Sequence, residues 1–121
     1  MADANVIATR YIAAWNERDA VRRRRLIADL WADDASFRDP VAAGDGLAGI
    51  DQVIAGIQAR FPDFRFTQVG QADGFGDFVR LTWELGPSGG EAPIQGSDFL
   101  TLENDRLKVV TGFFDRVPAP A

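Results

Sequence analysis

The sequence predicts an α+β domain in which three N-terminal helices pack on a curved, mainly antiparallel sheet. In the first half of the chain the apolar residues recur at helical spacing, and in the second half they alternate with a period of two. Short turn-forming segments separate the strands of the second half, and such connections favour antiparallel neighbours. Because 121 residues are the size of one domain, we expect a single domain over residues 1–121. We expect its tail, residues 118–121, to be frayed.

Three helices are predicted from caps and apolar stripes. The first covers residues 4–17 after Asp3 as N-cap, and the second begins after Asp19 and ends at residues 33–34. The third follows a glycine-rich loop at residues 43–49 and ends before Pro62. The second helix is expected to direct these apolar residues inward: Val21, Leu26, Ile27, Leu30 and Trp31.

Strands are predicted from alternating side chains between turn signals. A short strand over residues 35–39 is ended by Pro40. Longer strands are expected over residues 64–71, 78–85, 94–103 and 107–116. A sheet that bends around helices leaves a pocket where the two layers separate, and we expect such a pocket to be apolar here.

Charge and composition exclude several classes of protein. The net charge of −5 and the pI of about 4.6 argue against binding to nucleic acid or to an anionic membrane. The basic run Arg22 to Arg25 is expected to be a solvated helix face. The chain shows no basic region followed by an apolar run and no stretch of about 18 apolar residues. We therefore expect a cytoplasmic protein.

The chain contains no Cys and no His. No thiolate nucleophile, cysteine-ligated metal or Ser/His/Asp arrangement can form, and most zinc and iron sites lack their usual ligands. Carboxylates, Tyr11 and Lys108 remain for proton transfer. We expect a reaction that needs neither a metal nor a cofactor.

Two carboxylates stand in apolar rows of the predicted strands. Asp39 shares a strand face with Phe37, and Asp98 shares one with Leu100. Asp39 before Pro40 is also typical of a structural turn. Asp98 is harder to explain structurally, since a strand interior disfavours Asp and an unpaired buried charge is costly. A slip of one residue in register would make Asp115 the inward acid instead.

Three segments carry a resemblance over nearly the whole chain: YIAAWN at residues 11–16, LWADDASFRDPV at residues 30–41 and SDFLTLEN at residues 97–104. They resemble the nuclear transport factor 2-like superfamily, and within it the SnoaL-like proteins and the ketosteroid isomerases. The resemblance implies a cone-shaped α+β fold around an apolar pocket. It implies less about the reaction, because this fold hosts enzymes and non-catalytic binding modules.

The resemblance to the ketosteroid isomerases implies roles for three residues. Tyr11 matches the tyrosine that binds the oxyanion, Asp39 the carboxylate that moves the proton, and Asp98 the acid that stays protonated beside the tyrosine. That enzyme is a known example of carboxyl groups with divergent pKa values. Resemblance to SnoaL-like cyclases instead implies an aldol ring closure with Asp98 as acid or base. Tyr11 is also a plausible core residue.

The expected partner is a small hydrophobic ligand, and a non-catalytic ligand-binding or dimerisation module is the alternative to an enzyme. Side chains expected in the core, and secondarily on the pocket wall, are Trp15, Phe37, Trp83, Leu100 and Phe113. Apolar residues expected on the exposed sheet face are Phe78, Phe99, Val110 and Phe114. We expect a homodimer through that face.

Overall fold

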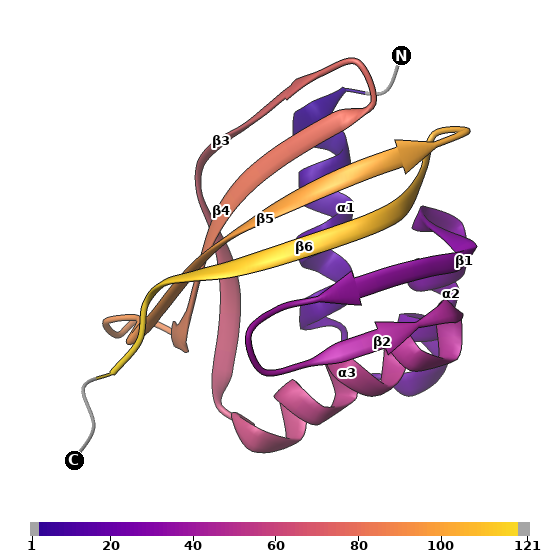
Figure 1. Ribbon diagram of the computed structural model, residues 1–121. Coiled ribbons are helices and arrows are strands. Elements are labelled where there is room, and N and C mark those ends of the chain that lie inside the picture. Colours follow the sequence, from indigo (N-terminus) through magenta and orange to yellow (C-terminus); the bar gives the residue numbers. More distant parts are fainter. Residues whose placement is uncertain (1–2, 119–121) are drawn as a thin grey trace.

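The computed structural model describes residues 3–118, so most of the predicted tail, residues 119–121, lies outside the described residues. The described chain forms three helices and one six-stranded sheet in the order β2-β1-β6-β5-β4-β3. Figure 1 shows α1 behind the curved sheet and α3 beneath β1 and β2. The predicted α+β class is confirmed.

The helices begin where capping side chains satisfy free backbone N–H groups. They are α1 (Ala4–Asn16), α2 (Ala20–Leu30) and α3 (Gly46–Arg60). The Asp3 carboxylate accepts hydrogen bonds from the backbone N–H groups of Asn5 and Val6, and Asp19 accepts one from Arg22. Both predicted N-caps are confirmed.

The prediction that the second helix continues to residues 33–34 is wrong. β1 (Trp31–Arg38) begins directly after Leu30, and Trp31 pairs with Leu107 of β6. The acidic pair lies inside this strand, where Asp33 and Asp34 are exposed to solvent. A shift of register after Trp31 lets the buried tryptophan and the exposed acids occupy one strand.

A short strand within the glycine-rich loop was not predicted. This strand, β2 (Ala43–Asp45), pairs with β1. A Cβ atom on Gly44 would lie 2.6 Å from the carbonyl oxygen of Gly49 in α3. Position 44 therefore needs glycine, because the strand and helix backbones touch there. In the sequence, a glycine required for such close packing cannot be told from a glycine in a flexible loop.

The four long strands lie at the predicted positions: β5 has the predicted bounds, and the other three extend beyond theirs. They are β3 (Phe64–Phe75), β4 (Phe78–Pro87), β5 (Ile94–Glu103) and β6 (Arg106–Arg116). Consecutive long strands pair antiparallel, whereas β1 pairs parallel to β6. The sheet is therefore mixed and mainly antiparallel.

The arginine run is only partly a solvated face. Arg22 is exposed, but Arg23 is buried, and its Nε donates to Asp51 Oδ1 of α3 at 2.6 Å. Arg23 also donates to the Gln58 side chain at 3.0 Å. Val21, predicted to face inward, is half exposed. The arginine that ties α2 to α3 thus occupies part of the inward face of α2.

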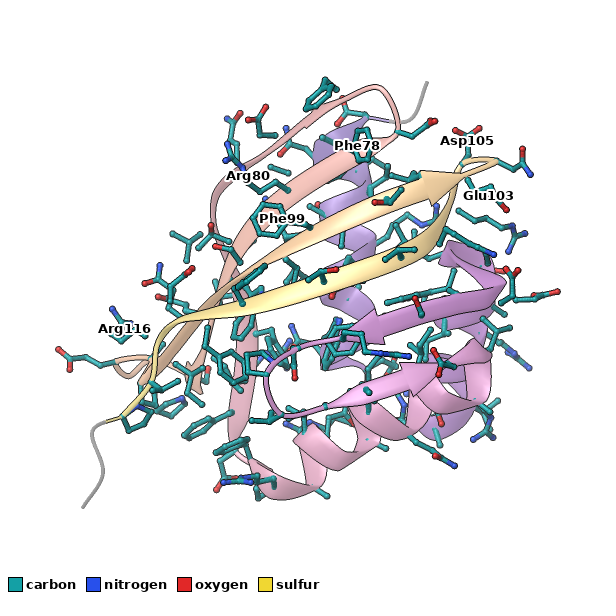
Figure 2. The ribbon with its side chains drawn as sticks, viewed as in Figure 1. Phe78, Arg80, Phe99, Glu103, Asp105 and Arg116 are labelled. Atoms are coloured by element: carbon teal, nitrogen blue, oxygen red, sulfur yellow. The ribbon has the colours of Figure 1, made fainter. Side chains whose placement is uncertain are left out.

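The outer face of the sheet carries several large apolar side chains. Figure 2 shows Phe78 of β4 and Phe99 of β5 on the face of the sheet turned away from α1. The predicted faces of β6 are inverted: Val110 is buried and Phe114 half buried, while Phe113 is 54% exposed. Residues that we define as the outer patch are Phe75, Phe78, Phe99, Val109 and Phe113. Within residues 3–118, no helix is long and apolar enough to cross a membrane.

Candidate active site

A cavity of about 430 Å³ lies between α1, α3 and the inner face of the sheet. Its wall is mostly aromatic and aliphatic, with few ionisable groups. Its lining residues include Tyr11, Trp15, Phe37, Asp39, Arg60, Phe61, Phe64, Trp83, Ile94, Asp98 and Phe114.

A buried hydrogen bond joins Tyr11 and Asp98 at the closed end of this cavity. The Tyr11 hydroxyl, carried by α1, donates to Asp98 Oδ2 of β5 at 2.6 Å. Both side chains are nearly inaccessible to solvent, with exposed fractions of 1% and 4%. A phenol and a carboxyl group from opposite layers of the fold therefore meet on the wall of an apolar cavity.

Burial shifts both groups toward their protonated forms. Loss of hydration raises the pKa of Asp98 to about 6, although the hydrogen bond from Tyr11 and the nearby Trp83 indole oppose this rise. Burial, together with the adjacent Asp98, raises the pKa of Tyr11 well above its ordinary value. At neutral pH the phenol is therefore protonated, and the Asp98 carboxyl titrates close to the physiological range.

Asp39 has both a structural role and a place on the cavity wall. It follows β1 directly, and its Oδ1 accepts hydrogen bonds from the backbone N–H groups of Val41 at 2.9 Å and Ala42 at 2.7 Å. This is the turn that an Asp before a proline suggested. Asp39 nevertheless lines the cavity, where its Oδ2 makes no hydrogen bond within the described chain.

Gly112 of β6 allows the two carboxyl groups to approach each other. It pairs with Asp98 across the sheet. A Cβ atom on Gly112 would lie 2.7 Å from Asp98 Oδ1 and 3.3 Å from the Asp39 Cβ. Asp39 and Asp98 therefore converge on the space that a side chain at Gly112 would fill.

Two tryptophans present unused donors at this end of the cavity. The Nε1 atoms of Trp15 and Trp83 are buried without a hydrogen-bond partner in the described chain. The Trp15 indole lies close enough to Tyr11, and the Trp83 indole close enough to Asp98, to lower the pKa of each. Buried N–H groups without a partner are uncommon in native structures, so these two indoles are unusual features of the cavity wall.

The structure places three of the five predicted lining residues on the cavity wall: Trp15, Phe37 and Trp83. Leu100 lies instead in the closed core, at 1% exposure, and Phe113 lies in the outer patch. Phe114, predicted to face outward, lines the cavity in place of Phe113. The adjacent apolar pair Phe113–Phe114 fits either strand face, so alternation alone could not assign it.

Asp115 does not replace Asp98 as the inward acid. It is exposed and accepts a hydrogen bond from the Ser97 hydroxyl at 2.6 Å on the outer side of the sheet. Residues that sequence reasoning missed include Ile57, Arg60, Phe61, Phe64 and Phe66. The alternation in β3 is a signal for Phe66, whereas the turn after α3, which brings Phe61 and Phe64 to the wall, carries none. The described residues hold no group of three Asp or Glu side chains suited to a metal ion.

The amino-acid sequence of this domain matches a known family. The family model described as a SnoaL-like domain matches residues 8–110. The chain belongs to the SnoaL-like family. The matched range contains Tyr11, Asp39 and Asp98, three polar residues of the cavity wall.

Solved structures support the assignment of this SnoaL-like domain. A SnoaL-like family protein of Agrobacterium tumefaciens strain C58, provisionally named an isomerase, is 38% identical with a TM-score of 0.89. That match covers 93% of this chain and 97% of the other. No curated protein matches the sequence significantly.

More distant structures share the nuclear transport factor 2-like fold of this SnoaL-like domain. A protein of Kribbella flavida, provisionally named a ketosteroid isomerase, is 21% identical with a TM-score of 0.71, covering 98% and 82% of the two chains. One of Sinorhizobium meliloti, provisionally named a polyketide cyclase, is 14% identical with a TM-score of 0.69, covering 88% and 93%. At these identities the likeness shows the fold alone.

Proposed function

We propose that this SnoaL-like domain is a cofactor-independent isomerase or cyclase that transfers a proton on a small hydrophobic carbonyl compound. The observation that carries the proposal is the buried hydrogen bond of 2.6 Å between Tyr11 and Asp98 on the wall of an apolar cavity. Asp39, at the same end of the cavity, supplies a second carboxyl group. Proton donors facing such a cavity stabilise a developing oxyanion.

In the proposed isomerisation, Asp39 removes a proton from the carbon next to the substrate carbonyl. The C–H electron pair forms the enolate double bond, and negative charge develops on the carbonyl oxygen. For Tyr11 and Asp98 to donate hydrogen bonds to that oxygen, Asp98 carries its proton and the Tyr11 hydroxyl turns from Asp98 Oδ2 toward the substrate. Asp39 then returns the proton to a different carbon. The product is therefore an isomer of the substrate, and the enzyme regains its starting state.

The provisional names of related structures support this class of reaction. The name isomerase belongs to the protein of Agrobacterium tumefaciens at 38% identity, whereas the name polyketide cyclase belongs to that of Sinorhizobium meliloti, which at 14% identity supports the fold alone. Both reactions begin when a proton is removed next to a carbonyl group, so one arrangement of acids serves either.

A second assignment within this class makes Asp98 the group that moves the proton. Its pKa of about 6 lies near neutral pH, where a general acid or base is most effective. Asp39 Oδ1 is occupied by two backbone hydrogen bonds, which favours an anchoring role for Asp39 in this version. An aldol ring closure with Asp98 as acid or base fits this assignment.

Turnover of a β,γ-unsaturated ketone tests the two assignments, because its conjugated product absorbs in the ultraviolet. If Asp39 moves the proton, Asp39→Asn lowers kcat by about 10²–10⁴-fold. Asp115→Asn is the control, since it removes an exposed carboxylate from the outer face. Full activity of Asp39→Asn together with an inert Asp98→Asn would select the second assignment.

A non-catalytic binding module would carry the same cavity without the chemistry. Substituted phenols distinguish the two, because an oxyanion site binds the ionised phenol more tightly and an apolar cavity binds the neutral form. Preference for the neutral phenol, with no turnover of any ketone, would favour the binding module. The cytoplasmic location and the absence of a cofactor remain part of the proposal, and activity in dialysed protein tests the latter.

A further inference from the structure

Charges are unevenly distributed along the cavity wall. Asp98 lies at the closed end with 4% exposure, and the half-buried Asp39 approaches it there. The lining residue with a positive charge is Arg60, which is exposed in the last turn of α3. The wall between them is predominantly apolar. The cavity therefore runs from a buried, proton-donating end to an exposed cationic mouth.

Arg60 differs from most arginines of the described chain. Arg23, Arg38 and Arg80 form ion pairs with carboxylates. Arginines whose side chains donate to backbone carbonyls are Arg10, Arg18, Arg106 and Arg116. Arg60 takes part in none of the ion pairs within residues 3–118. Its N–H donors are thus free to bind an anion.

An aromatic pair supports the Arg60 guanidinium at the mouth. Its central carbon lies 5.5 Å from the centre of the Phe61 ring. Phe61 in turn stacks on Phe64, with ring centres 5.0 Å apart and planes 12° apart. Both rings line the cavity. Stacking leaves the edge of the guanidinium plane free, and that edge pairs with carboxylates.

We propose that the ligand of this cavity is a hydrophobic carbonyl acid, whose carboxylate is bound by Arg60 at the mouth while its carbonyl group reaches Tyr11 and Asp98. This substrate class rests on the proposed function for its carbonyl end only. A carboxylate at the closed end would lose its hydration beside two acidic side chains, Asp39 and Asp98, so the ligand enters with its apolar carbonyl end first. Arg60 is then the residue that determines specificity for acids.

Arg60 also has a structural explanation, because a positive charge in the last turn of a helix is favourable. The two explanations differ in what they predict. If Arg60 has only a structural role, its substitution changes the stability of α3 and changes the affinity for charged and neutral ligands equally. An anion-binding Arg60 discriminates between ligands of the same shape that differ in charge.

Two fluorescent probes of similar shape test the proposal: the anionic 1-anilinonaphthalene-8-sulfonate and the neutral N-phenyl-1-naphthylamine. Dissociation constants are measured by fluorescence titration at low ionic strength. We expect Arg60→Gln to weaken binding of the anionic probe by about fivefold to tenfold and to leave binding of the neutral probe unchanged. Arg60→Lys, which keeps the charge but loses the planar fork, should fall between.

Two control variants locate the effect. Arg25→Gln removes an exposed arginine of α2 outside the cavity, so it changes the net charge equally and should leave both affinities unchanged. Ile94→Trp enlarges a half-buried side chain on the cavity wall and should weaken the binding of both probes. Circular dichroism confirms that each variant is folded.

The outcomes separate this proposal from the proposed function. The role of Arg60 would be overturned if Arg60→Gln lost the same affinity for both probes. It would also be overturned if Arg25→Gln lost as much affinity for the anionic probe as Arg60→Gln does. In that case the Asp39 and Asp98 kinetics with a neutral ketone still test the chemistry. Charge discrimination by Arg60 in a protein that turns over no ketone would keep the anion site and reject the catalysis.

Discussion

The buried Asp98 carboxyl group makes the stability of the fold depend on pH. Its pKa is about 6 in the folded protein, above the ordinary value near 4 that applies to the unfolded chain. Between these values the native state binds more protons, so the free energy of unfolding falls as pH rises through about 6. The stability that protonated Asp98 provides is complete below pH 4 and absent well above pH 6.

Substitution by asparagine removes this dependence, because the amide cannot ionise. We expect the free energy of unfolding of Asp98→Asn, relative to wild type, to increase by about 2–3 kcal/mol between pH 4 and pH 7. Urea denaturation at each pH measures it. Asp115→Asn, an exposed change on the same sheet, should show no such trend. A flat difference for Asp98→Asn would mean that Asp98 titrates normally.

Single residues also show how far the sequence predicts the site. Asp98 could be predicted as a site residue because it stands in an apolar row of a strand, where a carboxyl group rarely has a structural role. Phe113 and Phe114 could not be assigned, since the side chains of both are apolar and the strand has register shifts. The dual role of Asp39 needed coordinates, since turn-forming and cavity-facing Asp residues have the same local sequence.

Among the elements, α2 and α3 depend on one buried ion pair. The Nε atom of Arg23 lies 2.6 Å from Asp51 Oδ1, and both side chains are largely shielded from water. Loss of one partner leaves a buried charge without compensation. We expect Arg23→Leu to lower the free energy of unfolding by about 3–5 kcal/mol, and Arg23→Leu with Asp51→Leu to recover most of it. Thermal or urea unfolding measures both variants.

The neighbouring arginine provides the control for this prediction. Arg22 pairs with Glu17 and Asp19 at 3.6 Å and 3.8 Å, but its side chain is 70% exposed. Arg22→Leu should therefore change stability by less than about 1 kcal/mol. A large loss in Arg22→Leu, or a double variant no better than Arg23→Leu, would contradict the buried-pair explanation.

At the scale of elements, caps and periodicity located the helices and long strands. Asp3 and Asp19 mark helix starts because their side chains satisfy free N–H groups. The start of β1 at Trp31 was missed because its pairing with Leu107 is set by a strand far along the chain. Local sequence carries no signal for such a distant partner.

For the whole molecule, the outer patch supports the homodimer that we propose. Its rings lie in close pairs: Phe75 with Phe78 at 5.5 Å, and Phe99 with Phe113 at 5.8 Å between centres. Exposed apolar side chains gathered on one sheet face favour association.

We expect wild type to sediment as a dimer at micromolar concentration, and Phe99→Glu with Phe113→Glu to sediment as a monomer. Analytical ultracentrifugation measures both. Val21→Glu is the control, since Val21 is similarly exposed but lies on α2, outside the patch. A monomeric wild type, or a dimer that survives both changes, would refute association through this face.

The parallel pairing of β1 with β6 also decides when the cavity can form. In Figure 1, β1 lies beside β6, although most of the chain separates them. During synthesis the β1–β2 hairpin cannot pair with its sheet neighbour β6 until β6 has left the ribosome. Asp39 and Asp98 can therefore converge across Gly112 only once β6 is in place, and we expect this distant closure to slow folding.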